Sequence, residues 1–292
     1  MYLGLLTRQT PIESQFINSL ADNLNAEICL GSVTTVPEGS KWLSYTYLHV
    51  RMKFNPLAYG VTFKMIDQDP GLEMHRQDLI RVAGRLLDKA QMIRFDEATG
   101  TFHATDLGRT ASHYYIKYDT IEMTNIKLRQ IMSDKEILGA ISDCSEFQQL
   151  KVRDEEMEEM DMLHEACLLP VMGGIENTNG KVNCLIQAYI SRARVEGFSL
   201  VSDMGYVAQN VTRIVRALFE IAIKRGWALL SGRLLNICKS IEKQLWHSQS
   251  PFRQFENQLS FEILEKIEYK NLSIDRLRDM NAKEYVILYF KI

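Results

Sequence analysis

A long helical pattern lies at residues 202–225, which read SDMGYVAQNVTRIVRALFEIAIKR. Its apolar side chains recur at steps of three and four residues, as on the buried face of an amphipathic helix. Ser202 or Asp203 suits the N-cap, and Gly226 suits the position just after the end. The pattern predicts one long helix packed against others. The apolar face is formed by Val207, Val211, Ile214, Val215, Leu218, Ile221 and Ala222.

The opposite side of this helix carries a polar stripe whose spacing lines the side chains up. An aromatic ring can stack on a base, arginine can pair with phosphate and glutamine can hydrogen-bond, so the set suits single-stranded nucleic acid. The alternative is an ordinary solvated face with Arg216–Glu220 and Glu220–Lys224 pairs, and the pattern alone favours this alternative. The stripe consists of Tyr206, Gln209, Arg213, Arg216, Glu220 and Lys224.

The chain before residue 111 has the pattern of a winged helix. The first ten residues lack a helical period, and helices are expected at 12–20 (with Pro11 at the start), from residue 23, at 38–52 and at 72–90. Two short runs at 92–97 and 101–105 flank a loop that contains Gly100, which indicates a β-hairpin. The helices carry no cluster of Arg, Lys, Asn or Gln at the spacing of base readout, so packing is the expected role of this module.

Beyond residue 111 the chain reads as helices only. They are expected at 123–132, 133–141, 151–169, 202–225, 234–245, 261–267, 274–280 and 283–289. The fold class is therefore mainly α: a winged helix with a hairpin wing, then a helical bundle, then a helix-loop-helix.

Two segments imitate functional motifs. The acidic run at 154–161, DEEMEEMD, is expected to be the solvated face of a helix that buries Met157, Met160 and Leu163. Residues 174–182, GIENTNGKV, imitate a phosphate-binding loop, but five residues separate the glycines instead of four, and valine follows Lys181 where such a loop has Ser or Thr. This segment is expected to be a helix-connecting loop with Lys181 near the start of the next helix.

Composition excludes several classes of protein. The 292 residues hold 34 Lys+Arg against 37 Asp+Glu, a net charge of −3, so the surface as a whole is not built to bind a polyanion. The five cysteines contain no C-x-x-C pair and no His/Cys cluster has metal-ligand spacing, which favours buried free thiols in a reducing compartment and no metal site. The apolar runs are too short for a membrane span, and the N-terminus lacks the features of a targeting signal.

Several motifs resemble the large eukaryotic superfamily 2 (Ski-like) helicases that carry a Sec-63 homology unit. They are TPIESQ at 10–15, LNAEI at 24–28, WLSYTYL at 42–48, DLGRTASHYYI at 106–116, KVRDEE at 151–156, QAYISR at 187–192 and RIVRALFEI at 213–221. The resemblance spans almost the whole chain up to about residue 280.

The resemblance implies an order of domains. Residues 1–22 would be the tail of the second RecA-like lobe, 23–110 the winged helix, 111–248 the helical bundle of the Sec-63 unit and 249–292 a truncated helix-loop-helix. In the family, a ratchet helix of this bundle lies across the path of the translocating strand. The polar stripe falls on that helix, so the resemblance makes Tyr206, Gln209, Arg213, Arg216 and Lys224 the nucleic-acid-binding candidates.

The resemblance also implies a function. The chain would be the non-catalytic C-terminal part of an ATP-dependent 3′–5′ helicase cassette that guides single-stranded DNA or RNA. It holds no P-loop, D-E-x-H box or arginine finger, so no catalytic residue and no activity of its own are expected; ATP and Mg²⁺ would belong to RecA-like lobes that partner it. The resemblance further implies that other subunits of a larger complex are partners and that no membrane is involved. The expected location is the nucleus or the cytoplasm. The alternative is a Sec-63-type protein-interaction scaffold.

Overall fold

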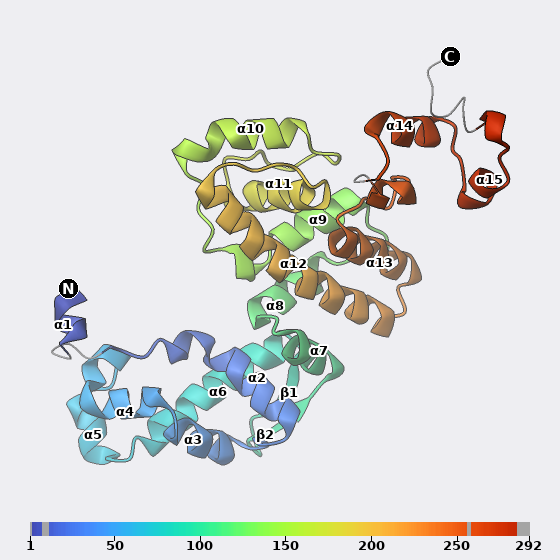
Figure 1. The fold of residues 1–292 in the computed structure, drawn as a ribbon. Coiled ribbons are helices and arrows are strands. Elements are labelled where there is room, and N and C mark those ends of the chain that lie inside the picture. Colours follow the sequence, from blue (N-terminus) through green and yellow to red (C-terminus); the bar gives the residue numbers. More distant parts are fainter. Residues whose placement is uncertain (1, 8–11, 256–257, 285–292) are drawn as a thin grey trace. The chain divides into compact units, whose positions relative to one another are not determined.

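The computed structural model describes residues 2–7, 12–255 and 258–284, and its contacts divide the chain into two compact units. Unit 1 comprises Met1–Leu128 with Cys144–Glu146, and unit 2 comprises Arg129–Asp143 with Phe147–Ile292. The fold is mainly helical, and one two-stranded sheet is present among the described residues, which confirms the predicted fold class (Figure 1). The predicted domain boundaries stay predictions.

Unit 1 has a winged-helix arrangement in which α6 is the central helix. This helix packs against α2, α3 and strand β1, and it buries Ile80, Ala83 and Leu87 (Figure 1). The helices of unit 1 are α1 (Tyr2–Leu6), α2 (Leu20–Leu30), α3 (Val36–Ser44), α4 (Tyr47–Phe54), α5 (Phe63–Gln68), α6 (Glu73–Lys89), α7 (Asp106–Tyr114) and α8 (Tyr118–Lys127), with 3-10 turns η1 (Phe16–Ser19) and η2 (Pro56–Tyr59).

The predicted hairpin is confirmed as strands β1 (Ile93–Asp96) and β2 (Thr101–Ala104), which pair antiparallel. Gly100 closes the turn with a φ of 71°, in the left-handed region that glycine adopts without strain. The Phe102 ring of the hairpin packs against α6 at Gly84, where an added Cβ would lie 2.8 Å from that ring. The wing is therefore fixed to the central helix by a contact that needs glycine.

The entry segment at residues 12–15 is not helical, so the helix predicted at 12–20 is wrong over its first four residues, while residues 16–19 form η1 and α2 begins at Leu20; Pro11 lies outside the described residues. The Glu13 carboxylate accepts hydrogen bonds from Arg51 (Nη2, 2.8 Å), Asn55 (Nδ2, 2.8 Å) and Tyr59 (Oη, 2.7 Å). These three bonds lower the pKa of Glu13 to about 2. The bonds to Asn55 and Tyr59 join residues more than forty positions apart. They hold the segment extended against the rest of unit 1.

Other predicted elements of unit 1 need smaller corrections. The first residues were expected to be loop-like, but α1 forms one turn, closed by the Thr7 N–H bonded to the Leu3 carbonyl (2.9 Å); five residues are too few for a period to show. The helix predicted at 38–52 is two helices, because Thr46 caps a new one by accepting the His49 N–H.

Helix α8 corrects the helix predicted at 123–132. It begins at Tyr118, five residues earlier, and is over by Leu128, whose backbone is extended. Its N-cap, Lys117, offers no side-chain acceptor; Asp22 instead accepts the Tyr118 N–H (2.7 Å) and the buried Glu146 accepts the Lys117 N–H (3.0 Å). Carboxylates suit a helix N-terminus because its free N–H groups carry partial positive charge.

Asp22 is the less favourable of these two caps. Burial raises its pKa to about 6, although the hydrogen bond from Tyr118 opposes the rise. A carboxyl group whose pKa rises on folding contributes its full stability below its unfolded value of 3.8, and that contribution falls as the pH rises to about 6.

We therefore expect Asp22→Asn to stabilise unit 1 by about 1–2 kcal/mol at pH 7.5, because the Asn oxygen still accepts from Tyr118 without a desolvated charge. The gain should disappear by about pH 4. Urea unfolding followed by the fluorescence of Trp42 measures it, with exposed Asp67→Asn as the control. A gain that persists unchanged at pH 4 would contradict this account.

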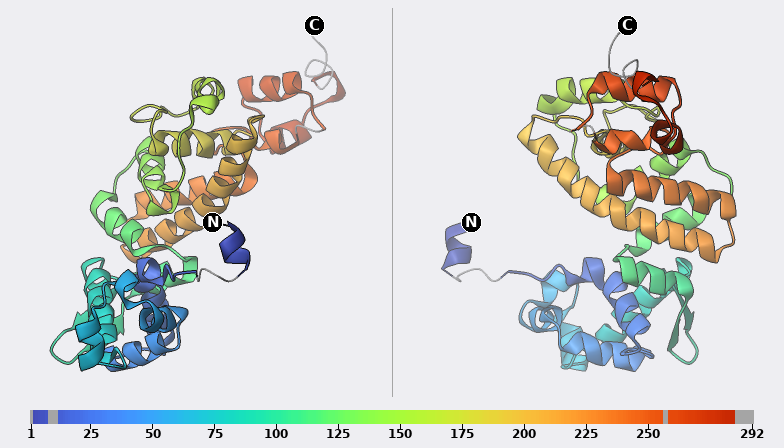
Figure 2. Two further views of the ribbon diagram at one scale, coloured as in Figure 1. Left: turned by 90° about the vertical axis from the view of Figure 1, so that its left-hand side faces the viewer. Right: turned by 45° about the vertical axis from the view of Figure 1, so that its right-hand side comes forward.

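Unit 2 is a helical bundle around α11, ten of whose 13 residues are buried. α11 lies against α9, α10, α12 and α13, and α12 packs along α13 as their ribbons show (Figure 2). The helices are α9 (Asp134–Ser142), α10 (Met157–Glu165), α11 (Thr178–Ile190), α12 (Phe198–Lys224), α13 (Ala228–Lys243), α14 (Phe261–Tyr269) and α15 (Ile274–Arg278), with 3-10 turns η4 (Asp154–Glu156) and η5 (Pro251–Phe255). The 3-10 turn η3 (Ser145–Phe147) lies where the chain passes from unit 1 back into unit 2.

The prediction of one helix over 151–169 is wrong at both ends. The chain forms η4 and α10, and it leaves the helix after Glu165. The Leu169 backbone then forms two hydrogen bonds with the side chain of Gln187 in α11 (2.8 and 2.9 Å). A tertiary contact thus replaces the helical bonds that local periodicity predicted.

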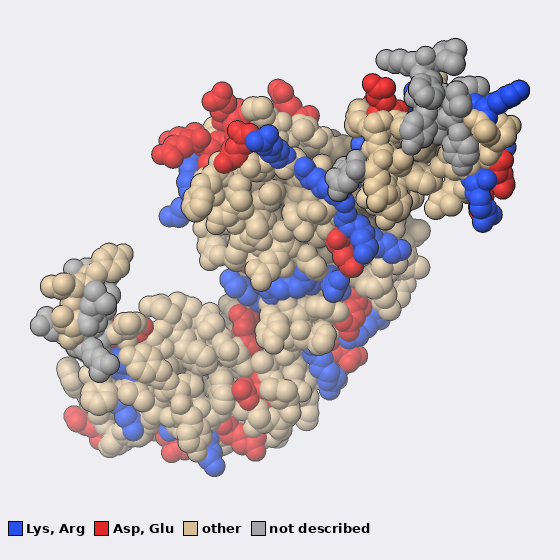
Figure 3. Space-filling view, in the orientation of Figure 1, with Lys and Arg blue, Asp and Glu red and all other residues tan. Residues whose placement is uncertain are grey.

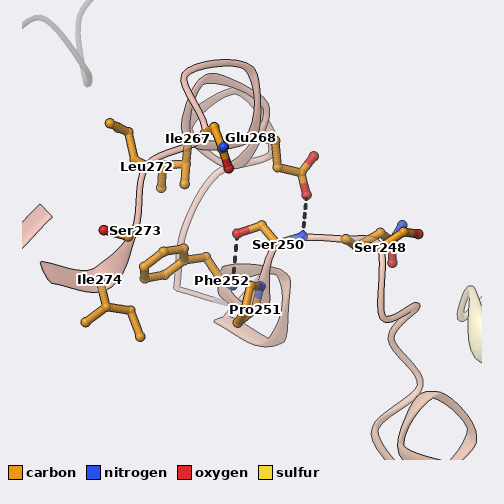
Figure 4. A pocket seen from close by; sticks show the side chains of 11 residues that line it. Ser248, Ser250, Pro251, Phe252, Ile267, Glu268, Leu272, Ser273 and Ile274 are labelled. Carbon is orange, nitrogen blue, oxygen red and sulfur yellow. Dashed lines mark hydrogen bonds between the residues drawn. The ribbon is translucent and has the colours of Figure 1, made fainter. Parts of the chain in front are cut away.

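The helices predicted at 261–267 and 274–280 are confirmed as α14 and α15. They share a small core of Ile263 and Ile267 with Phe252, Leu272 and Leu277. A cavity of about 690 Å³ opens beside it, where Glu268 accepts the Ser250 N–H and Ser250 accepts the Phe252 N–H (Figure 4). No residue of the predicted stripe lines this cavity. Most of the helix predicted at 283–289 lies outside the described residues.

Candidate nucleic-acid interface

Helix α12 carries all five candidate residues, and its predicted apolar face is confirmed. The seven apolar residues of that face are all buried. Of the stripe, Gln209, Arg216 and Lys224 are exposed, and Tyr206, Arg213 and Glu220 are half-buried. The stripe is therefore the side of α12 that a ligand can reach.

The start of α12 differs from the prediction, because the helix begins at Phe198 rather than after Ser202 or Asp203. Glu159, in the acidic run, accepts the N–H groups of Glu196 and Gly197 just before the first turn (2.6 and 3.0 Å). Gly197 is the N-cap residue, so this carboxylate from another segment binds the backbone at the point where the helix starts. Asp203 is a buried residue inside the helix, not its cap.

Arg213 is oriented by a neighbour that the sequence reading missed. Its Nε and Nη2 atoms donate to the side-chain oxygen of Asn210 (3.1 and 2.6 Å), and Asn210 in turn donates to the Tyr206 carbonyl (2.8 Å). Asn210 is 7% exposed, so this arrangement is anchored in the buried side of the helix. Asn210 and Arg213 are three residues apart on one helix, a spacing at which side chains meet, so the sequence could have indicated this contact.

The other two basic residues of the stripe have acidic partners. Arg216 pairs with Glu242 of α13 (2.9 Å), and the predicted Glu220–Lys224 pair is confirmed (2.9 Å). The Arg216 and Glu242 side chains are each about half exposed, and such a pair contributes only about 0–1 kcal/mol. A phosphate group can therefore displace Glu242 at low cost. Figure 3 shows blue and red side chains intermingled where α13 lies.

The imitation of a phosphate-binding loop has a structural explanation. Asn177 caps α11 by accepting the Gly180 N–H (2.7 Å), and Gly173 and Gly174 have φ values of 81° and 75°. Gly180 lies so close to Gly174 that an added Cβ would be 1.7 Å from the Gly174 carbonyl oxygen. The expected helix-connecting loop is confirmed, with Lys181 in the first turn of α11.

Lys181 is fully buried at the centre of an ion-pair cluster that the sequence reading missed. Its Nζ lies 2.6 Å from Glu156 and 2.7 Å from Asp203, and it donates to the Lys151 carbonyl (2.9 Å). Arg153 pairs with both carboxylates. Burial opposes ionisation of Glu156, but hydrogen bonds from Lys181, Ser199 and Arg153 outweigh it and lower its pKa to about 2.

This cluster corrects the interpretation of the acidic run as a wholly solvated face. Glu156 is 3% exposed, and Glu159 binds the start of α12. Met160 and Leu163 are buried as predicted, but Met157 is only half-buried. The cluster joins η4, α11 and α12, so it fixes the N-terminal half of the helix that carries the stripe.

No set of three His, Cys, Asp or Glu side chains suited to a metal ion is found among the described residues. Nor does any described helix have the length and hydropathy needed to cross a membrane.

Comparison with known proteins adds two family matches. A model of the Sec63 Brl domain matches residues 104–288, and a model of a winged helix-turn-helix domain matches residues 13–89. The chain is 57% identical over 284 residues to activating signal cointegrator 1 complex subunit 3 of Gallus gallus. It is 49% identical to the DExH-box ATP-dependent RNA helicase DExH14 of Arabidopsis thaliana, and 44% identical to the human U5 small nuclear ribonucleoprotein 200 kDa helicase. Each match covers 97% of this chain but only 13% of the relative.

Proposed function

The chain belongs to the Sec63 Brl domain family, in the form found in Ski-like helicases, and from this premise we propose that α12 guides a single strand of nucleic acid. In this proposal the chain is the non-catalytic C-terminal part of an ATP-dependent 3′–5′ helicase cassette. The observation that carries it is the accessible polar stripe on one long helix: a half-buried aromatic ring, an exposed amide and three basic side chains.

The chemistry of the stripe suits a strand of any sequence. Bases stack on an aromatic ring whatever their identity, and arginine pairs with phosphate. Arg213 is pre-oriented by Asn210, so less conformational entropy is lost when it binds. Arg216 exchanges one weak acidic partner for a phosphate.

The proposed domain order, cofactors and partners are those that membership of this helicase family implies. Residues 1–22 are the end of a RecA-like lobe, 23–110 the winged helix, 111–248 the Sec63 bundle and 249–292 the helix-loop-helix. In this proposal RecA-like lobes bind ATP and Mg²⁺, and the residues of this chain do not. Single-stranded DNA or RNA, those lobes and subunits of a larger complex are the partners, in the nucleus or the cytoplasm.

Binding of a labelled single-stranded oligonucleotide, measured by fluorescence anisotropy with DNA and RNA versions, tests the stripe. We expect Arg213→Ala and Arg216→Ala each to weaken binding severalfold, since each removes one phosphate contact. Arg194→Ala is the matched control, because Arg194 is 88% exposed, pairs with Glu196 and lies outside α12. Unchanged affinity in both stripe variants would remove the strand-contact role and favour a protein-interaction scaffold.

A further inference from the structure

Two of the five cysteines lie in contact inside unit 2. Cys167 follows α10 and is half-buried, and Cys184 lies within α11 and is fully buried. Their Sγ atoms are 3.8 Å apart and share a hydrogen bond. A disulfide needs about 2.05 Å between the sulfurs, so rotation of the two side chains has to close only about 1.8 Å.

Hydrogen bonds on both sides of Cys167 keep its thiol close to that of Cys184. Upstream, the Cys167 thiol donates to the Leu163 carbonyl of α10 (3.4 Å), and Leu163 is itself buried. Downstream, two hydrogen bonds clamp the Leu169 backbone to Gln187, which lies three residues after Cys184 in α11. The chain on either side of Cys167 is thus fixed to the same packed helices, and the contact between the sulfurs is part of that packing.

We propose that Cys167 and Cys184 form a reversible oxidation site, in which a peroxide converts the thiol pair to an intramolecular disulfide. Cys167 is the sulfur that reacts first because it is the accessible one, and Cys184 is the resolving thiol. This site is independent of nucleic-acid binding by α12.

The reaction balances with hydrogen peroxide as the oxidant. The Cys167 thiolate attacks one peroxide oxygen, which gives a sulfenic acid and releases the other oxygen as water after protonation. The Cys184 sulfur then attacks the sulfenic sulfur; its proton and the departing hydroxyl leave as a second water, and the S–S bond forms. Two electrons pass from the thiol pair to the peroxide.

The ionisation of the two thiols agrees with these roles. The hydrogen bond between the two sulfurs lowers the pKa of Cys167, against the effect of burial, while the same bond and burial raise the pKa of Cys184. The thiolate is the reactive form of cysteine. Cys29 provides an internal comparison: it is also half-buried, but burial raises its pKa, and its thiol donates to the Asn25 side chain (3.7 Å).

The test treats the folded whole chain with graded hydrogen peroxide, unfolds it in urea so that iodoacetamide reaches every remaining thiol, and identifies peptides by mass spectrometry after digestion without reductant. We expect alkylation of Cys167 and Cys184 to be lost together and before that of Cys29. A cross-linked peptide lighter by two hydrogen atoms should appear and should disappear with dithiothreitol.

A variant separates the two steps. In Cys184→Ala, Cys167 should remain as a sulfenic acid that dimedone traps, and the cross-linked peptide should be absent. The unaltered chain keeps the proposal testable if this variant does not fold. Oxidation of Cys29 before Cys167, or cross-links that join other cysteines as often as Cys167 and Cys184, would overturn the proposal.

Discussion

Replacement of Lys181 by methionine is expected to lower the free energy of unfolding of unit 2 by about 3–5 kcal/mol. The side chain is 0% exposed, and its amine contacts two carboxylates and one carbonyl oxygen. Methionine matches the length of the apolar stem but leaves Glu156 and Asp203 with the half-exposed Arg153 as their cationic partner. Buried charges without compensation are the reason for the large effect.

Unfolding in urea, followed by tryptophan fluorescence, measures this loss. Trp227 and Trp246 report on unit 2, and Trp42→Phe removes the signal of unit 1. Lys239→Met, at an exposed position of α13, is the control and should change stability by no more than about 0.5 kcal/mol. Combining Lys181→Met with Glu156→Gln and Asp203→Asn should recover part of the loss, because it removes the uncompensated charges. A loss as large in the control would contradict a role for the buried pairs.

Replacement of Gly180 by alanine is expected to cost unit 2 about 3 kcal/mol or more, because the methyl group has no room. The added Cβ would lie 1.7 Å from the Gly174 carbonyl oxygen and 2.8 Å from its carbon. These are backbone atoms, so no side chain can rotate away, and either the loop or the first turn of α11 must move.

The control for Gly180→Ala is Gly139→Ala in α9. Nothing lies within 4 Å of a Cβ at Gly139, and alanine is the better helix former, so this change should be neutral or stabilise by up to about 1 kcal/mol. The same urea experiment compares the two variants. Equal effects of the two changes would show that the close approach at Gly174 does not exist in solution.

Local periodicity predicted the helices and the hairpin in which buried residues recur at regular intervals along the element. Helix α6, the hairpin of β1 and β2 and the buried face of α12 are examples, since each shows a period of about 3.6 or 2 residues. The close approaches at Gly84 and Gly180 could not be predicted, because what a glycine faces depends on a segment elsewhere in the chain.

Several boundaries that the sequence misplaced are set by distant residues. Asp22 and Glu146 cap α8, Glu159 binds the start of α12, and none of these carboxylates lies in the helix that it holds. The entry segment is held through Glu13 by Arg51 of α4. A propensity scale cannot contain such contacts. The same reason hid the Lys181 cluster, which joins residues 22 and 25 positions apart.

The candidate interface stays a prediction. The sequence pattern predicted the buried face of α12, which the structure confirms, and the stripe lies outside that face. The pattern did not identify Asn210 or Glu242, which determine how Arg213 and Arg216 are held. Glu242 lies on another helix, so only the tertiary structure brings it to the stripe.

The salt dependence of single-strand binding tests strand guidance by α12 most directly. Each phosphate contact on a single strand contributes about −0.7 to the slope of log affinity against log salt concentration. The variant Arg213→Ala/Arg216→Ala should therefore bind more weakly and show a slope shallower by about 1.4. The control Arg129→Ala/Arg194→Ala also removes two arginines, both exposed and paired with glutamates outside α12, and should leave the slope unchanged. If the stripe variant keeps the affinity and the slope of the unaltered chain, α12 does not guide the strand.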